Sequence, residues 1–254
     1  MSRSVLSRSL EPLVSVLWGI FLIWTAWLAV VWIAPVGTGE LGFVVGSPAP
    51  PNADLRRAVL LLAENADLAW LALAVMNLHL VLMRAHGLRI TRLWLAISAG
   101  GGLLLGALNV KTGVLFGTMQ FGPALGMKLL GVAAGWVLLW AVLVPGAHEA
   151  VLWMRPRASH RAVAILSAAV VVLTLLNLEW PVRSIRGWWM RPPDSTGALG
   201  VPWQNWISWA AWPGLMAFAM REKDVRAGVT KRSSKSAVIL ASVNIIALLA
   251  RLRG

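Results

Sequence analysis

Long apolar segments recur along this chain, and they constrain its fold more than any other feature. A helix that crosses the hydrocarbon core of a bilayer needs about 20 predominantly apolar residues. Inside a bilayer every backbone polar group must be satisfied within the protein, and helices achieve this. The chain is therefore predicted to be an all-α, polytopic integral membrane helix bundle with six or seven transmembrane helices. The predicted spans are residues 13–34, 55–83, 93–108, 123–144, 162–178, 202–220 and 237–250.

The composition agrees with a membrane protein and excludes several soluble classes. Charged residues make up only 13% of the 254 residues, against about 25% in a typical soluble domain. The absence of cysteine excludes thiol catalysis, Cys-ligated zinc and iron–sulfur clusters. The net charge of +13 comes from basic residues that lie between the apolar runs. That distribution indicates contact with a lipid bilayer and argues against nucleic-acid binding.

The basic residues also predict how the chain is oriented. With a cytoplasmic N-terminus, the segments on the cytoplasmic side carry 14 Lys and Arg, and those on the other side carry 8. Because cytoplasmic loops are enriched in Lys and Arg, this bias favours a cytoplasmic N-terminus. The sequence shows no internal repeat and no separate soluble domain, so residues 1–254 are expected to form a single membrane domain.

Two segments between the apolar runs differ from ordinary connectors, namely residues 109–122 and 180–201. Each follows an odd-numbered run and precedes an even-numbered one, so both are expected on the same side of the membrane. The beginning of the second run, with Glu64 and Asp67, lies on that side too. We therefore expect these three features to form one polar cluster at one membrane face, as a site for a lipophilic substrate requires.

Three acids are candidates for chemistry at that face. Ionisable groups at membrane depth are costly, and their presence indicates function. Glu64 and Asp67 are three residues apart, so a continuous helix would place them on one face. A desolvated carboxyl beside a second carboxylate keeps its proton and can donate it. Glu179 ends the fifth run and is the third candidate, while an alternative for Glu64 is an interfacial ion pair with Arg56 or Arg57.

No metal site and no cofactor are expected. The four histidines, His79, His86, His148 and His160, do not form the clustered boxes of membrane di-iron enzymes. His148 and Glu149 are adjacent, but the sequence offers no evident third ligand. It also contains no Gly-rich phosphate loop ahead of a helix, and no paired Asp-rich motif that would hold a diphosphate through magnesium.

Tryptophan is unusually frequent, with 16 Trp and no Tyr. Trp203, Trp206, Trp209 and Trp212 recur every third residue and would wrap around half of a helix. An interfacial aromatic belt with packing explains most of these residues. The alternative is that some of the rings line an apolar groove, where their faces also stabilise a cation.

Three consecutive glycines, Gly100, Gly101 and Gly102, lie inside the third apolar run. Three glycines weaken a helix in water, but in a membrane they permit a neighbouring helix to approach the backbone closely. We therefore expect a tight helix contact at this point of the bundle.

The two unusual segments resemble the carotenoid biosynthesis protein family, which includes the bacterial carotenoid 1,2-hydratase. The first block reads Asn109-Val-Lys-Thr-Gly-Val-Leu-Phe-Gly-Thr-Met-Gln-Phe-Gly-Pro-Ala-Leu-Gly-Met-Lys128. The second block contains Trp188 and Trp189 and closes with Val201-Pro-Trp-Gln-Asn-Trp-Ile-Ser-Trp209. An acid of the family pattern is replaced here by Gly106, and its Glu directly before Pro181 is replaced by Trp180, with Glu179 one step back.

The resemblance implies a protein of the bacterial cytoplasmic membrane that hydrates the terminal C1,C2 double bond of an acyclic carotenoid. An acid protonates the alkene, aromatic faces shield the tertiary cation, and water captures it without any cofactor. Asp67, Glu64 and Glu179 would be the acids, and Asn205 would position the water. The substrate-binding residues would be Phe116, Phe121, Trp188, Trp189, Trp203, Asn205 and Trp206.

Two other functions agree with the same sequence. One is a family member without activity that binds a carotenoid or another isoprenoid as a scaffold. The other is a small-solute membrane transporter. Other enzymes of the carotenoid pathway are candidate partners of the hydratase or of the scaffold.

Overall fold

The computed structural model describes residues 11–33, 52–192, 197–229 and 232–253, and this part of the chain is mostly helical. These described residues form no closed sheet, so the prediction of an all-α bundle is confirmed. The helices are α2 (Glu11–Ile33), α3 (Ala53–Glu64), α4 (Ala66–His86), α5 (Leu88–Thr112), α6 (Ala134–Met154), α7 (His160–Ser184), α8 (Trp203–Ala227) and α9 (Lys235–Arg253).

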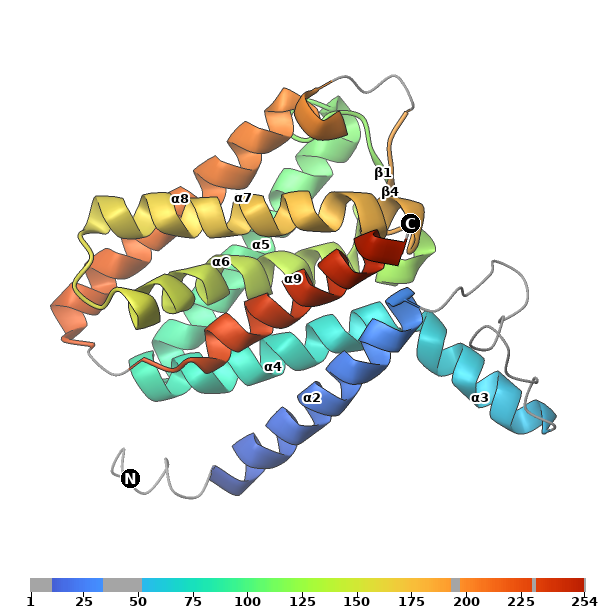
Figure 1. The fold of residues 1–254 in the computed structure, drawn as a ribbon. Helices are drawn as coiled ribbons and strands as arrows, with labels where there is room; N and C mark the ends of the chain where they lie inside the picture. Colours follow the sequence, from blue (N-terminus) through green and yellow to red (C-terminus); the bar gives the residue numbers. More distant parts are fainter. Residues whose placement is uncertain (1–10, 34–51, 193–196, 230–231, 254) are drawn as a thin grey trace.

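Six of these helices are long and apolar enough to cross a membrane, in agreement with the expected six or seven spans. They are α2, α4, α5, α6, α7 and residues 235–252 of α9. The last run, expected to be short, thus forms a helix of spanning length. The 25-residue α8 is not among the six, but it packs along α7 (Figure 1).

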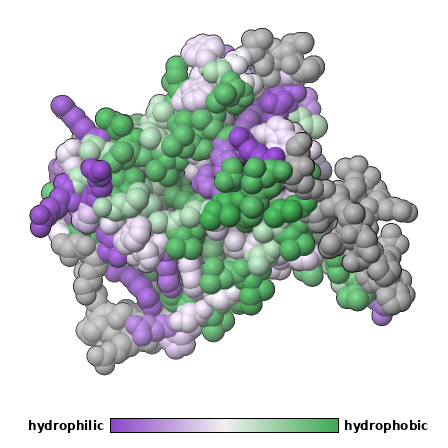
Figure 2. All heavy atoms as spheres, viewed as in Figure 1, coloured by the Kyte–Doolittle hydropathy of each residue, from purple (hydrophilic) through white to green (hydrophobic). Residues whose placement is uncertain are grey.

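Helix α6 is the centre of the bundle. Within its most apolar 18-residue stretch 78% of the residues are buried, a larger share than in any of the other five spanning helices. It packs against α4, α5, α7, α8 and α9, while α2 covers α4 and α9 on one side (Figure 1). On the face shown in Figure 2, hydrophobic side chains cover much of the surface between the two ends of the bundle. This apolar exterior is what lipid contact requires.

The second predicted span is wrong in one respect, because residues 55–83 do not form one helix. The chain breaks at Asn65, which separates α3 from α4. The Asn65 side-chain amide donates to the Leu61 carbonyl (2.8 Å) and so closes the last turn of α3. Helix α3 leaves the bundle at an angle (Figure 1).

The fourth predicted span, 123–144, is displaced by about three turns. Its expected first residues instead form a 3₁₀ turn, η1 (Pro123–Leu125), and two paired strands, β2 (Lys128–Leu129) and β3 (Val132–Ala133). Helix α6 then continues through Pro145 to Met154. Proline is tolerated inside membrane helices, because neighbouring groups satisfy the freed carbonyl. The displacement moves His148 and Glu149 from an expected loop into the most buried helix.

The glycines of α5 make the expected close contact. A Cβ at Gly102 would lie 2.7 Å from Trp140 Cβ, and one at Gly101 would lie 2.1 Å from the Trp212 ring. The Gly102 carbonyl also accepts a hydrogen bond from Trp136 Nε1 (3.1 Å). Large indole side chains therefore fill the space that the missing Cβ atoms leave.

Gly102→Ala should destabilise the protein, because the new methyl group overlaps the fixed Cβ of Trp140. Overpacking of this kind costs about 1–3 kcal/mol. Gly100→Ala is the matched control, since nothing lies within 4 Å of a Cβ there, and alanine improves helix propensity by up to about 1 kcal/mol. Thermal unfolding in detergent compares the two variants. Equal melting temperatures would contradict the proposed contact.

Candidate functional site

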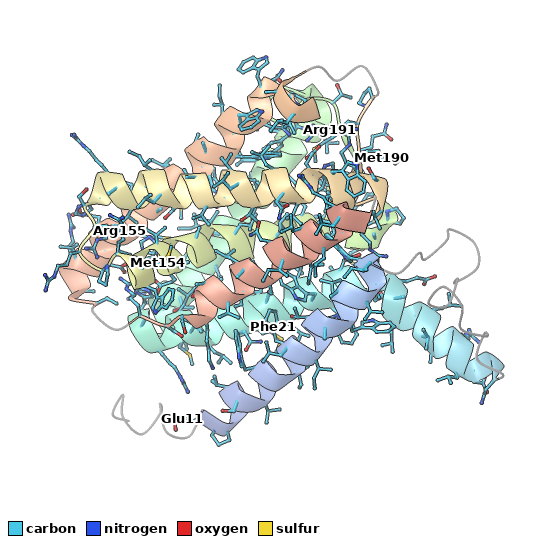
Figure 3. The ribbon with its side chains drawn as sticks, in the orientation of Figure 1. Glu11, Phe21, Met154, Arg155, Met190 and Arg191 are labelled. Atoms are coloured by element: carbon cyan, nitrogen blue, oxygen red, sulfur yellow. The ribbon has the colours of Figure 1, made fainter. Side chains whose placement is uncertain are left out.

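The two unusual segments meet at one end of the bundle, which we call the loop end. Strand β1 (Gln120–Phe121) pairs antiparallel with β4 (Trp189–Met190), with Phe121 opposite Trp189. Figure 3 shows Met190 and Arg191 at this end, and Met154 and Arg155 at the opposite end. The pairing of β1 with β4 and the ion pair of Arg186 with Asp67 at the start of α4 agree with the expectation that these three features lie together.

Asn109 shapes the first of these segments. It is buried near the end of α5, and its Oδ1 accepts hydrogen bonds from the backbone of Leu115 (3.1 Å) and Phe116 (2.6 Å). Its Nδ2 donates to the Gly117 carbonyl (3.0 Å). One side chain thus satisfies three backbone groups of a buried loop, which would otherwise be costly to desolvate.

Asn205 and Arg191 connect the two segments through the carbonyl of Phe116. Arg191 Nη1 donates to this oxygen, and the Asn205 amide, oriented so that both of its polar atoms are satisfied, donates to it as well (2.7 Å). The Asn205 oxygen accepts from Arg191. Both polar groups of Asn205 are therefore engaged by protein, and in this conformation the amide holds the loop.

Asp67 lies at the start of α4 and is fully buried. Its Oδ1 accepts from Trp32 Nε1 (2.7 Å) and its Oδ2 from Arg186 Nε (2.7 Å). Arg186 also donates to the Ala63 carbonyl (3.1 Å), which ties the α7–α8 connection to the end of α3. We call Asp67, Trp32 and Arg186 the Asp67 set.

Glu179 has the same kinds of partner. Its Oε1 accepts from Arg191 Nε (2.8 Å) and its Oε2 from Trp189 Nε1 (3.3 Å). A second guanidinium, that of Arg183, lies 3.7 Å away and is partly exposed. We call Glu179, Trp189 and Arg191 the Glu179 set. Each set thus combines one buried carboxylate with one indole donor and one guanidinium.

Aromatic rings connect the two sets. The Trp32 and Trp188 rings are edge to face at 5.6 Å between centroids, and Trp188 contacts Trp189 at 6.0 Å. Trp189 in turn meets Trp136, whose ring also packs against those of Phe116 and Phe121. The four predicted substrate-binding aromatics Phe116, Phe121, Trp188 and Trp189 therefore belong to one buried ring cluster.

Three other predicted residues lie outside this cluster. Glu64 is exposed at the end of α3. It therefore does not share a helix face with Asp67, and the expectation of two carboxyls competing for one proton there is wrong. Asp67 is the better shielded of the two, as expected. Trp203 is exposed at the first turn of α8, and Trp206 is half-buried.

A groove of about 760 Å³ opens beside the Glu179 set. Its wall is mostly apolar, with Leu176, Trp180, Leu199 and Val201 among its residues, and it also carries the polar or charged side chains of Asn177, Arg183, Ser184 and Arg251. Of the three predicted acids, Glu179 is the one that lines it. The groove therefore adjoins Glu179, whose side chain is only 6% exposed.

A second group of ionisable side chains lies at the opposite end of the bundle. His86 Nε2 is 2.9 Å from Glu149 Oε1, and His86 Nδ1 is 3.1 Å from Asp224 Oδ1. His148 Nε2 is 2.9 Å from Asp224 Oδ2, and Arg232 donates to both carboxylates. We call these five residues the histidine–acid cluster. Three of its ligand-bearing residues, His86, Glu149 and Asp224, are close enough together to hold a metal ion.

Sequence reasoning missed this cluster for an identifiable reason. The adjacent His148 and Glu149 were a visible signal, but the expected end of the fourth span at Val144 placed them in a loop. Burial by itself raises the pKa of the Asp224 carboxyl, but hydrogen bonds from His148 and His86 and the charge of Arg232 lower it overall. Asp224 is therefore a carboxylate, and its charge is balanced inside the cluster.

The fold and the loop end define a multi-pass membrane protein with a buried polar site that opens to an apolar groove. The carotenoid biosynthesis protein family matches residues 66–252, which is most of the chain, and the chain belongs to this family. It is a membrane protein of carotenoid biosynthesis. Neither the curated proteins nor the solved structures give a significant match.

Arg186→Gln should strongly destabilise the protein, because it leaves the fully buried Asp67 without its cation. Breaking one partner of a buried pair costs about 3–5 kcal/mol. The double variant Asp67→Asn with Arg186→Gln should recover much of this loss. Arg183→Gln is the control, since the Arg183 side chain is 31% exposed. Melting temperatures that fall equally in both single variants would show that Asp67 does not depend on Arg186.

Proposed function

We propose that the protein hydrates the terminal C1,C2 double bond of an acyclic carotenoid end group, at the loop end of the bundle. The proposal is carried by one observation: Glu179, a buried carboxylate with an indole and a guanidinium as partners, lines an apolar groove. Membership of the carotenoid biosynthesis family supports a carotenoid as the substrate.

The groove supports the binding of a long apolar substrate. Its volume of about 760 Å³ falls in the range of small-molecule sites, which is about 300–1,000 Å³. Leu176, Leu199 and Val201 offer apolar contacts for the polyene end group, and Trp180 offers a ring face. The rest of the polyene can remain among lipid chains, so only the reacting end needs to enter the protein.

The partners of Glu179 support its role as the acid. A neutral Glu179 transfers its proton to C2 of the double bond, and the alkene π electrons form the new C–H bond and leave a tertiary cation at C1. Arg191 and Trp189 then stabilise the carboxylate that remains.

Water completes the reaction and restores the acid. The tertiary cation left by protonation is attacked by one water molecule, which forms the C–O bond. The resulting oxonium loses its proton to the carboxylate, and the product is a tertiary alcohol. The net change is the addition of one water, with no oxidation and no cofactor. Ring faces such as that of Trp180 can stabilise the cation between these steps.

Asp67 is the alternative donor. It has the same kinds of partner as Glu179, and the rings of Trp188 and Trp189 link the two sets. Asp67 is not among the residues that line the groove, so it comes second in this proposal.

The test is pigment analysis after expression in a bacterium that accumulates lycopene. The wild-type chain should convert lycopene to more polar, hydroxylated pigments without any added cofactor. Glu179→Gln should lower the yield by about 10²-fold or more, because it removes the general acid. Glu64→Gln is the matched control, since this exposed acid should be replaceable without loss.

The other outcomes have definite meanings. Activity that survives in Glu179→Gln but is lost in Asp67→Asn would assign the donor to Asp67. Unmodified lycopene in cells where the wild-type chain is inserted in the membrane would contradict the hydratase. Co-purification of the unmodified pigment would then favour the scaffold that binds a carotenoid.

We further propose that the N-terminus is cytoplasmic and that the membrane is the bacterial cytoplasmic membrane. The 14-to-8 distribution of Lys and Arg supports this orientation. It puts the loop end and its groove on the outer side of the membrane, and the histidine–acid cluster on the cytoplasmic side.

Because the chain has no cysteine, single-cysteine variants test the orientation directly. Leu199→Cys at the loop end should react with a membrane-impermeant maleimide in intact spheroplasts. Pro156→Cys, exposed at the opposite end, should react only after permeabilisation. The reverse pattern would show that the topology is inverted, with the N-terminus on the outer side. Labelling of both variants from outside would contradict the assignment of the two ends to opposite sides of the membrane.

A further inference from the structure

The histidine–acid cluster is built from residues of four separate segments. His86 ends α4, His148 and Glu149 belong to α6, Asp224 lies near the end of α8, and Arg232 precedes α9. The side chains of His86, Glu149 and Asp224 are at most 2% exposed. Taking two carboxylates this far out of water is costly unless positive charge compensates them.

The spacing of the donor atoms matches a metal site. The ligand atoms of His86, Glu149 and Asp224 all lie within 4.8 Å of one another. His86 Nε2 is 2.9 Å from Glu149 Oε1, and the other ring nitrogen, Nδ1, is 3.1 Å from Asp224 Oδ1, so an ion bound by one of these nitrogens takes the place of one of these contacts. With Zn–N and Zn–O bonds of about 2.0–2.1 Å, neighbouring ligand atoms of a tetrahedral site lie about 3.3 Å apart. An ion therefore fits once the His86 ring and the second carboxylate adjust.

Two buried atoms of the cluster are left over from the ion-pair network. Glu149 Oε2 and His148 Nδ1 have no hydrogen-bond partner within the described part of the chain, although both side chains are fully buried. An unsatisfied buried polar group costs about 1–3 kcal/mol. Charge pairing within the cluster leaves these two atoms without a partner, whereas an ion bound by Glu149 can use its second oxygen.

We propose that His86, Glu149 and Asp224 bind a divalent transition-metal ion, with His148 as a further ligand or as the residue that positions Asp224. Mixed imidazole and carboxylate donors suit Zn²⁺, Mn²⁺ and Fe²⁺. The ion joins α4, α6 and α8 at the end of the bundle opposite the groove. Its role is structural, so the inference does not depend on the proposed hydratase.

Arg232 competes with the ion in this arrangement. Its two terminal nitrogens donate to Glu149 Oε1 and Asp224 Oδ2, which are oxygens that an ion would use. The guanidinium thus supplies the compensating charge when no metal is bound, and it must move aside when one is. Removal of Arg232 should therefore strengthen metal binding and make the stability of the fold depend on the bound metal.

The experiment uses the full-length chain purified in detergent and stripped with a chelator. Zn²⁺ is titrated and the bound metal is measured by elemental analysis after desalting. The wild-type chain should retain one equivalent. Glu149→Gln and Asp224→Asn should each weaken binding by at least about tenfold, the lower end of the effect seen even for outer-shell partners.

A similar imidazole–carboxylate pair in the same protein serves as the control. His160 and Glu222 lie 3.0 Å apart, but their side chains are 33% and 42% exposed, and they lie outside the cluster. Glu222→Gln should leave the stoichiometry and the affinity unchanged. If it lowers them as much as Asp224→Asn does, the bound metal is on the surface and the proposal is wrong.

Arg232→Gln keeps the test decisive if the ligand variants fail to fold. This variant should bind Zn²⁺ about tenfold more tightly or better, because the competing cation is gone. When both proteins are free of metal, the melting temperature of Arg232→Gln should be lower than that of the wild type. It should recover when Zn²⁺ is added. If neither the wild type nor Arg232→Gln retains metal, the cluster is an ion-pair network and the proposal is overturned.

Discussion

The pairing of buried carboxylates with arginine is the constraint on which the rest of this structure depends. Each of the four carboxylates buried in the described part of the chain lies beside an arginine from a connecting segment: Asp67 by Arg186, Glu179 by Arg191, and both Glu149 and Asp224 by Arg232. An unpaired charge cannot persist in such a place. Each pair therefore fixes where a loop returns to the bundle, and both polar sites arise where these loops are held.

Some of the tryptophans perform a second task beside packing. Indole N–H groups of α2 donate to Asp67 and to the carbonyls of Leu62 and Ala66, so they bind α2 to the break between α3 and α4. Indole is an apolar body with one donor, and this suits a bundle that must satisfy buried acceptors without bringing in more charge. The Trp32 ring also contacts Trp188, which links the two buried carboxylates of the loop end through Trp189.

The sequence predicted the loop end well, because its signals are local or depend on simple parity. Seven apolar runs put residues 109–122, residues 180–201 and Asp67 on one side of the bundle, and the pairing of β1 with β4 and of Arg186 with Asp67 agrees. The error in α6 was one of bounds, since the predicted span 123–144 begins and ends earlier than the helix Ala134–Met154. This error hid contacts to residues far away in the sequence, because His148 and Glu149 can meet Asp224 and His86 only when α6 extends to Met154.

The sequence by itself determined the membrane bundle and the family, because hydropathy, basic-residue counts and two motif blocks are properties of the chain that need no partner. Only the tertiary structure decided which carboxylate faces a groove, which is exposed and which meets histidine. Those choices depend on residues more than 60 positions apart, such as His86 with Glu149 and Asp67 with Arg186. A pairing across that distance is set by how helices pack around α6, and no periodicity within one segment encodes it.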